Sequence, residues 1–481
     1  MMSASKAMPT SNDRQQRTQE IASARWGTVT LDERLGVLQR ARHLMAERRA
    51  AFTAAISPQL TRTGADTLAA ELLPLLDACR FLEREAASLL APRRLYGEGR
   101  PWWLRHVEAE VWRAPLGRVL VIAPSNFPLF LPGVQALQAL AAGNGVTWKP
   151  GRGGRRVADL FAGAMNDAGL PSGVLRITEE SVQAGVHALR SGVDKVFFTG
   201  STASGRSVQH ACADVGVPCV LELGGCDAVC VLPGADLERV AKAVTFGLRL
   251  NGSAVCMSPR RLLALGDTMT ALKPLLLREL AGVPPIALSP PVAERLQELV
   301  DDARLLGARV LGEVEPGAQR PLLLDGAGPH MRAACTDLFA PLLSLMTSSQ
   351  IAKMPETLAE CGYALTVSIF GPEREARTLA SVVRAGVVTI NDLIVPTVDP
   401  RVPFGGRDNS GFGVTRGAEG LLEMTAVKTV LLRHGRDTRH YEPAGDAHHA
   451  LFDGALRISH ARRWRERWQG LRDTLRAART L

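Results

Sequence analysis

Long apolar runs are missing from this chain of 481 residues. Its most apolar stretch, residues 119–140, is interrupted by Asn126 and three prolines, and residues 1–17 are polar. A membrane-spanning helix needs about 20 consecutive apolar residues, and a secretory signal needs an apolar core. The sequence therefore predicts a protein that neither spans a membrane nor carries a secretory signal.

Lysine is scarce as well, since only seven of the 57 basic residues are lysines. The formal net charge is +9, but residues 455–481 alone contribute eight arginines against two acidic side chains, a balance of +6. The remainder of the chain is therefore close to neutral. A protein that binds nucleic acid through its main body is excluded, because such a body carries a strongly basic face.

The eight cysteines include no C-x-x-C pair, and no histidine lies at a spacing suited to zinc. We therefore expect no metal site. Unpaired thiols in a chain of this size are typical of a reducing compartment, so we expect a cytoplasmic location. The length exceeds what one hydrophobic core can organise and predicts two or three domains.

Segments typical of buried strands alternate with amphipathic helical segments along most of the chain. Residues 25–95 are expected to be helical, and residues 100–115 to form a two-stranded ribbon. The expected strands are 117–122, 146–149, 195–199, 219–223, 261–265, 364–370 and 386–390. Strands separated by helices at intervals of 25 to 50 residues are typical of parallel, doubly wound sheets. The fold class predicted is α/β, with two such domains.

Glu222 and Cys256 form the pair of residues that most clearly suggests chemistry. Glu222 precedes two glycines, and Cys256 lies 34 positions later in a stretch of small residues. A thiolate can attack a carbonyl carbon, and a carboxylate can activate the water that releases the resulting acyl group. Each residue also has an ordinary explanation, as a buried small apolar side chain or a solvated surface carboxylate.

Three further features have both a functional and an ordinary interpretation. Residues 198–205 follow a strand and open a helix, which suits either a pyrophosphate site or a tight turn. Lys149 ends a predicted strand, where it either contacts a ribose or phosphate or is solvated. The amide of Asn126 either donates to an oxyanion or stabilises a turn.

Taken together, these residues make the sequence resemble the aldehyde dehydrogenase superfamily over residues 20–435. The matching segments, in the family's order and spacing, are Pro115-Leu116-Gly117, Asn126-Phe127-Pro128, Gly143-Asn144, Lys149-Pro150, Gly169-Leu170-Pro171, Phe198-Thr199-Gly200-Ser201, Glu222-Leu223-Gly224-Gly225, Cys256, Leu338-Phe339, Pro403-Phe404-Gly405-Gly406, Ser410-Gly411 and Val427-Lys428. The resemblance implies a cofactor-binding domain over 1–225 and a catalytic domain over 226–425. It also implies an oligomerisation element built from the 100–115 ribbon and a strand at 426–435.

The resemblance further implies roles for single residues. Cys256 forms a thiohemiacetal with a small-molecule aldehyde and then a thioester, Asn126 contributes to the oxyanion hole, and Glu222 activates the hydrolytic water. The implied cofactor is NAD or NADP. Its implied contacts are Lys149, Gly200, Ser201, Gly205, Leu223, Asp337 and Phe339. The implied assembly is a homodimer or a homotetramer.

Several positions depart from the family pattern. Ser253-Ala254 replaces the usual Gly-Gln before the nucleophile, Asp337 replaces a glutamate, and Val414-Thr415 replaces Arg-Glu. Arg152 stands where NAD-preferring members commonly carry an acidic residue. A guanidinium can pair with a 2′-phosphate, so we expect NADP to be accepted; the alternative is that Arg152 points to solvent.

The leading expectation is therefore NAD(P)-dependent oxidation of an aldehyde to a carboxylate. One alternative is a CoA-acylating aldehyde dehydrogenase or acyl reductase. Glu222 argues against it, because transfer of the acyl group to the thiol of CoA does not require a base that activates water. The second alternative is a non-catalytic binding or scaffold protein on the same fold.

The segment 436–481 lies outside the resemblance. Its Trp464, Trp468, Leu471 and Leu475 recur at helical spacing and form one apolar stripe on an arginine-rich helix. Such a helix either lies on an anionic membrane surface or docks on its own protein or a partner subunit.

Overall fold

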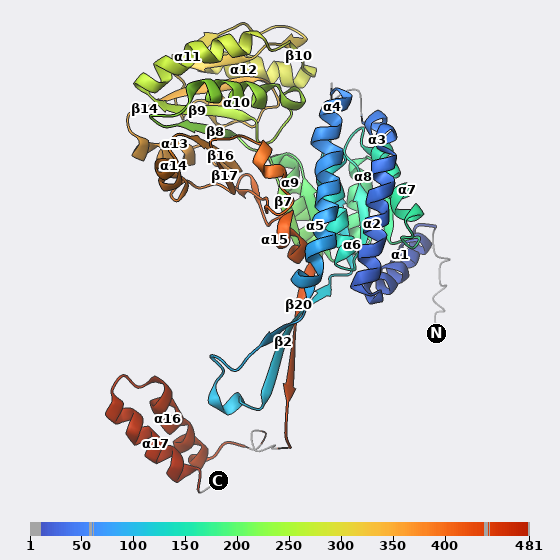
Figure 1. Ribbon diagram of the computed structural model, residues 1–481, viewed down its shortest axis with the longest axis vertical. Helices are drawn as coiled ribbons and strands as arrows, with labels where there is room; N and C mark the ends of the chain where they lie inside the picture. Colours follow the sequence, from blue (N-terminus) through green and yellow to red (C-terminus); the bar gives the residue numbers. More distant parts are fainter. Residues whose placement is uncertain (1–10, 57–59, 61, 437–440, 442, 480–481) are drawn as a thin grey trace, which may run out of the picture. The chain divides into compact units, whose positions relative to one another are not determined.

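The protein divides into two compact units in a computed structural model that describes residues 11–56, 60, 62–436, 441 and 443–479. The first unit comprises Met1–Pro92 and Trp112–Lys428, and the second comprises Arg93–Val111 and Thr429–Leu481 (Figure 1). Within the described residues, no helix has the combination of length and apolar character that crossing a bilayer requires.

The N-terminal part of the first unit is helical, as predicted. Its elements are α1 (Ser11–Thr28), α2 (Leu31–Glu47), α3 (Arg49–Ala55), α4 (Gly64–Thr67), the π-helical turn η2 (Leu68–Leu72) and α5 (Leu73–Leu90). Thr30 and Glu33 form a reciprocal capping box that begins α2. Apolar side chains from α2 and α5 join one core with helix α6 (Phe130–Ala141) and the first sheet.

The first sheet has the strand order β19-β7-β6-β3-β4-β5 among the described residues. The strands are β3 (Arg118–Ile122), β4 (Gly145–Lys149), β5 (Leu175–Ile177), β6 (Lys195–Thr199), β7 (Cys219–Glu222) and β19 (Gly411–Phe412). The intervening helices are α6 (Phe130–Ala141), α7 (Arg155–Asp167), α8 (Val182–Arg190) and α9 (Thr202–Val215). All pairings are parallel except that of β19 with β7. Lys149 and Glu222 thus lie at the carboxyl ends of two parallel strands, β4 and β7, and ligands of such folds bind at these ends.

The second sheet has the order β11-β13-β14-β9-β8-β16-β17 within the described ranges. Its strands are β8 (Asp227–Val231), β9 (Pro259–Leu265), β11 (Arg309–Leu311), β13 (Leu322–Asp325), β14 (Leu342–Ser348), β16 (Thr366–Phe370) and β17 (Val387–Ile390). Only β11 pairs antiparallel among them. Two apolar cores cover its two faces, because strands of a parallel sheet are buried on both sides.

Helices and short elements complete this half of the unit. The helices are α10 (Leu237–Arg249), α11 (Gly266–Ala281), α12 (Pro290–Leu305), α13 (Met354–Ala359) and α14 (Glu373–Ala380). Helix α15 (Gly417–Glu423) instead packs on α5 and α6 in the core of the first sheet. The short 3₁₀ turns are η4 (Leu250–Ser253), η5 (Arg332–Cys335), η6 (Ile351–Lys353) and η7 (Val395–Val398). Two small antiparallel pairs join β10 (Ile286–Ala287) to β12 (Ala318–Gln319) and β15 (Tyr363–Ala364) to β18 (Arg407–Asp408).

The boundary between the two units falls within a three-stranded sheet of order β1-β2-β20. Its strands are β1 (Arg93–Leu95), β2 (Val107–Pro115) and β20 (Thr425–Arg433). The ribbon expected at 100–115 therefore differs in its first strand, since β2 pairs with residues 93–95 and the turn η3 (Trp102–Leu104) lies between them. A strand of three residues has too short a pattern to be recognised from sequence.

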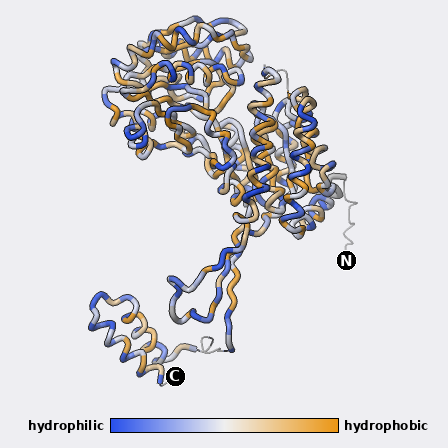
Figure 2. The backbone as a smooth tube through the Cα atoms, viewed as in Figure 1, coloured by the Kyte–Doolittle hydropathy of each residue, from blue (hydrophilic) through white to orange (hydrophobic). Residues whose placement is uncertain are grey.

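Helices α16 (Asp446–His460) and α17 (Trp464–Ala477) form a hairpin in the second unit. They cross at two glycines, because a Cβ on Gly454 would lie 2.7 Å from the carbonyl oxygen of Gly470. Hydrophilic and hydrophobic residues alternate along both helices (Figure 2). Trp464 and Trp468 are 67% and 58% exposed, so the predicted stripe does not face α16.

Candidate active site

The segment before Cys256 has an unusual backbone. Asn251, Gly252 and Ser253 all have left-handed φ values, of 50°, 60° and 60°. Each non-glycine residue in this conformation costs about 1–2 kcal/mol. Arg260 offsets part of that cost, because its Nη1 donates to Ser253 Oγ at 2.9 Å and its Nη2 to Ser253 O at 2.7 Å. The Ser253 side chain, a departure from the family pattern, is thus held by a buried arginine.

Cys256 and the Glu222 segment lie against each other in the structure. A Cβ on Gly225 would come within 2.5 Å of the carbonyl oxygen of Cys256, so only glycine permits this approach. Burial raises the pKa of the Cys256 thiol, and the carboxylates of Asp227 and Glu222 raise it further. The thiol is therefore neutral at pH 7 and needs a base to become a nucleophile.

Glu222 ends β7 with its carboxylate buried. Burial raises its pKa to about 7, although the charge of Arg416 and a hydrogen bond from Thr199 oppose the shift. The Thr199 hydroxyl lies 3.5 Å from Oε2, and the Thr415 hydroxyl donates to Oε1. A carboxylate with a pKa near the working pH suits general base catalysis.

Arg416 is a buried cation beside Glu222 and Cys256 that the sequence did not reveal. It is buried, donates to the carbonyl of Thr397 at 2.7 Å and stacks 4.2 Å from the centre of the Phe404 ring. Its charge acts on both Glu222 and Cys256. Nothing in the sequence distinguishes it from the other 49 arginines, and only its burial identifies it.

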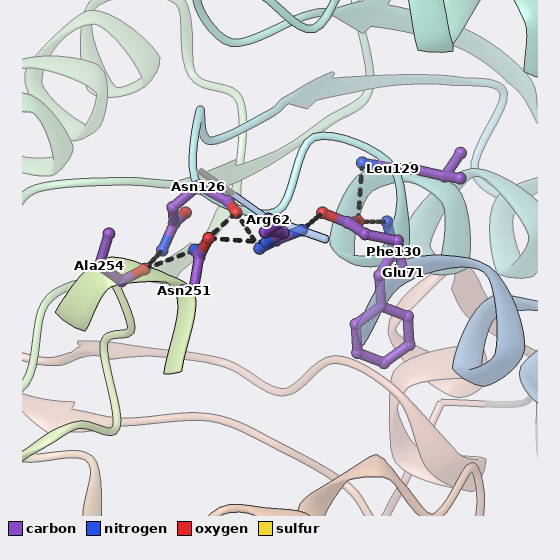
Figure 3. A network of polar contacts seen from close by, with 7 residues as sticks. All are labelled: Arg62, Glu71, Asn126, Leu129, Phe130, Asn251 and Ala254. Carbon is purple, nitrogen blue, oxygen red and sulfur yellow. Dashed lines mark hydrogen bonds and ion pairs between the residues drawn. The ribbon is translucent and has the colours of Figure 1, made fainter. Parts of the chain in front are cut away.

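Asn126 lies between β3 and α6 and reaches residues 251–256, the segment that leads to Cys256 and is called the nucleophile segment below. Its side-chain amide donates to the carbonyl of Ala254 at 2.9 Å, two residues before Cys256. An amide nitrogen carries two hydrogens, so this bond leaves a second donor for an oxyanion. The backbone carbonyl of Asn126 accepts from Arg62 and Asn251 (Figure 3).

The residues expected to contact pyrophosphate form a turn between β6 and α9. Ser201 is the N-cap of α9, and its hydroxyl accepts from the amide of Ser204 at 3.3 Å. A Cβ on Gly205 would lie 2.3 Å from the Leu223 side chain, so the helix packs closely on the Glu222 segment. The first turn of such a helix directs N–H groups at an anionic ligand.

Lys149 and Asp337 have polar atoms that a dinucleotide would satisfy. The Lys149 ammonium makes no hydrogen bond to any described residue; burial lowers its pKa, and Glu180 opposes this. Asp337 Oδ1 is buried without a partner among the described residues. Burial raises the pKa of Asp337 to about 6, against the charge of Arg260. Ribose hydroxyls are donors for such an oxygen, and the half-buried Phe339 lies two residues away.

Arg152 is exposed beyond the end of β4. A carboxylate is nonetheless present at this turn, because Glu180 accepts hydrogen bonds from the amides of Gly153 and Arg155, each at 2.9 Å. The turn after Lys149 therefore has an exposed cation, Arg152, and a carboxylate, Glu180, that is hydrogen-bonded to its backbone.

Comparisons with known proteins agree with this geometry. A sequence model of the aldehyde dehydrogenase family matches residues 3–430. A vanillin dehydrogenase of a Pseudomonas species is 32% identical over 453 residues, 88% of this chain and 89% of that protein. A Mycobacterium tuberculosis aldehyde dehydrogenase complexed with NAD+ has a TM-score of 0.78 at 25% identity, covering 86% of this chain and 88% of that chain. An NADP-dependent glyceraldehyde-3-phosphate dehydrogenase from Bacillus halodurans, complexed with NADP, has a TM-score of 0.81 at 27% identity, covering 88% and 90%. The predicted α/β fold class is confirmed.

Proposed function

Since this chain belongs to the aldehyde dehydrogenase family, we propose that Cys256, Glu222 and Asn126 carry its chemistry. The protein is an NAD(P)-dependent enzyme that oxidises aldehydes. The observation that supports these three roles is the convergence of the nucleophile segment, the end of β7 and the amide of Asn126 at one place.

In the first half-reaction, Cys256 attacks the aldehyde carbon and forms a thiohemiacetal. Asn126 donates its second amide hydrogen to the oxyanion, and preorganised donors of this kind contribute about 3 kcal/mol to transition-state stabilisation. Since the thiol is neutral at rest, its proton must leave to a solvent base as the carbon–sulfur bond forms. The residues assigned below to the cofactor would hold a nicotinamide that would accept the hydride from the thiohemiacetal carbon, and oxidation of this adduct leaves a thioester on Cys256.

In the second half-reaction, Glu222 activates the water that hydrolyses the thioester to a carboxylate. Its raised pKa makes it basic enough to take a proton from water during attack. Transfer of the acyl group to CoA would need no such base. This difference favours the hydrolytic reaction over the CoA-acylating alternative.

An aldehyde panel tests these roles. Cofactor reduction is measured with NAD and with NADP, with and without CoA, using Cys256→Ala as the blank; benzaldehyde and succinate semialdehyde represent uncharged and charged substrates. We expect turnover without CoA for at least one aldehyde. Turnover only with CoA would overturn the hydrolytic assignment, and no reduction above the blank would support the scaffold alternative.

We assign the cofactor contacts to Lys149 at the end of β4, to Gly200, Ser201 and Gly205 at the start of α9, and to Leu223, Asp337 and Phe339. The orphaned Oδ1 of Asp337 and the close packing at Gly205 support the assignment. Arg152, exposed and free to turn toward a 2′-phosphate, supports acceptance of NADP.

A homo-oligomer is proposed from the edge strand β20. This strand ends its sheet and exposes Val427, Leu431 and Leu432, at 62%, 66% and 53%. An apolar edge strand with unpaired backbone groups is a template for pairing with a second copy. Light scattering coupled to size exclusion should report a dimer or tetramer, and Leu431→Lys should shift it toward monomer; a monomeric native enzyme contradicts the proposal.

For the α16–α17 hairpin we propose contact with an anionic membrane surface, consistent with a cytoplasmic location. Trp464, Trp468 and Leu475 are exposed beside arginines on a segment with a balance of +6, which complements anionic headgroups. Full-length enzyme should co-sediment with vesicles of phosphatidylcholine and phosphatidylglycerol, and Trp464→Ser/Trp468→Ser should not. If neither the full-length enzyme nor the double variant is enriched in the vesicle pellet, or if the double variant loses its oligomeric state, the hairpin docks on a second copy instead.

A further inference from the structure

Arg62 is a buried arginine that lies between the two halves of the active site. Its side chain is 3% exposed and its guanidinium stacks 4.6 Å from the centre of the Phe127 ring. Resting on the proposed roles of Asn126 and Cys256, we infer that Arg62, with Glu71, is a positioning residue that sets the oxyanion amide against the nucleophile segment.

Three nitrogens of the guanidinium bind three different segments (Figure 3). Nη2 donates to the backbone carbonyl of Asn126 at 2.6 Å, and Nε donates to Asn251 Oδ1 at 2.6 Å. Nη1 donates to Glu71 Oε1 at 2.5 Å. The planar, five-donor fork of arginine suits this geometry, and the ammonium of lysine does not reproduce it.

Glu71 fixes the orientation of Arg62 from the opposite side. Its side chain is fully buried, and its second oxygen accepts from the amides of Leu129 and Phe130 at 3.1 and 2.7 Å. These amides belong to the segment that follows Asn126 and begins α6. A buried ion pair contributes little net stability, because desolvation offsets its attraction. Its effect here is to hold the turn that carries Asn126.

Asn251 transmits the constraint to the nucleophile segment. Its amide donates to the carbonyls of Asn126 and Ala254, at 3.1 and 3.0 Å, and the amide of Asn126 donates to the same Ala254 oxygen. Asn126 and the segment leading to Cys256 are therefore tied together twice, with Arg62 holding both asparagines. A displacement of about 1 Å at a reacting centre can slow chemistry about 100-fold.

A substrate-binding role for Arg62 is a different explanation that the structure does not favour. The three hydrogen bonds and the Phe127 ring enclose the guanidinium. An anionic substrate would have to displace Glu71, which already pairs with it. A positioning role therefore predicts a change in the rate of acylation with little change in the KM for aldehyde.

The test compares Arg62→Lys with Arg42→Lys in the full-length enzyme. Arg42 pairs with Glu83 at 2.6 Å among the same N-terminal helices, so it reports the effect of weakening a structural ion pair there. Single-turnover formation of reduced cofactor should be about 10- to 100-fold slower in Arg62→Lys, with KM for aldehyde and Kd for cofactor within about two-fold. Arg42→Lys should retain the native rate.

A native acylation rate in folded Arg62→Lys, or equal slowing in both variants, overturns the inference. If Arg62→Lys does not fold, Asn251→Gly serves instead, because glycine tolerates the φ of 50° at this position. It should slow acylation similarly, and a native rate would again overturn the inference. A failure of the proposed function gives a different result. If Cys256 is not the nucleophile, Cys256→Ala should still produce the burst of reduced cofactor, whichever residue stands at position 62.

Discussion

The hydroxyl of Thr415 hydrogen-bonds the carboxylate of Glu222 across 193 positions of sequence. Thr415 is one of the departures from the family pattern, and β19 brings it there by pairing antiparallel with β7, with Gly411 opposite Glu222. Thr415, which departs from the family pattern, therefore donates a hydrogen bond to Glu222, the proposed base.

Replacing Glu222 by glutamine should separate the two half-reactions. Glu222→Gln keeps the shape of the side chain but removes the base for water, so we expect a first burst of reduced cofactor followed by at least a 100-fold slower steady state, in line with the contribution of a general base. Stopped-flow absorbance at 340 nm measures both phases. The exposed Glu179→Gln is the control, and a normal steady state in Glu222→Gln would show that the role is misassigned.

The steady-state rate should rise with pH around the pKa of Glu222, about 7. Only the ionised carboxylate accepts a proton, and it predominates above that pKa. Because the charge of Arg416 lowers the Glu222 pKa, Arg416→Met should raise it and move the rising limb to higher pH. A pH profile of the deacylation rate checks the direction; a shift to lower pH, or none in folded enzyme, contradicts the electrostatic role of Arg416.

Cofactor choice should respond to the charge at Arg152. Arg152→Glu places a carboxylate where a 2′-phosphate would lie, so the ratio of kcat/KM for NADP to that for NAD should fall about 10-fold, the factor that 1.4 kcal/mol of lost pairing gives. Arg156→Glu, which is also exposed and lies in the first turn of α7, is the matched control. A strong preference for NAD that Arg152→Glu leaves unchanged would mean that Arg152 points to solvent.

A methyl group on Gly224 should weaken cofactor binding. Its Cβ would lie 1.9 Å from Asp337 Oδ2, so Gly224→Ala must displace the proposed ribose contact, and we expect the Kd for cofactor to rise about 10-fold or more. Gly163→Ala is the control, because nothing lies within 4 Å of its Cβ and alanine favours a helix by about 1 kcal/mol. Isothermal titration with NAD and NADP measures both; unchanged binding by folded Gly224→Ala contradicts the role of Asp337.

The alternation of strands and helices was predictable because hydrophobic periodicity is local. The strand predicted at 195–199 coincides with β6, and the strands predicted at 117–122 and 146–149 match β3 and β4 to within one residue. β1 was missed because three exposed residues carry no pattern.

Contacts between distant side chains were not predictable. Arg62 has no distinguishing neighbour in sequence, and its three partners lie 9, 64 and 189 positions away. Arg416 likewise becomes notable only through burial. The residues that hold the site together are set by tertiary packing, whereas Cys256 and Glu222 were recognisable from motifs that their chemistry requires.

The position of β19 has a consequence for protein synthesis. The first sheet lacks this edge strand, and Glu222 lacks Thr415, until the ribosome has added residue 415 of the 481. At about 5–20 residues per second, the interval of 193 residues corresponds to about 10 to 40 s of translation. During most of that time the nascent chain already carries Cys256, and Glu222 has not yet acquired its hydrogen bond from Thr415.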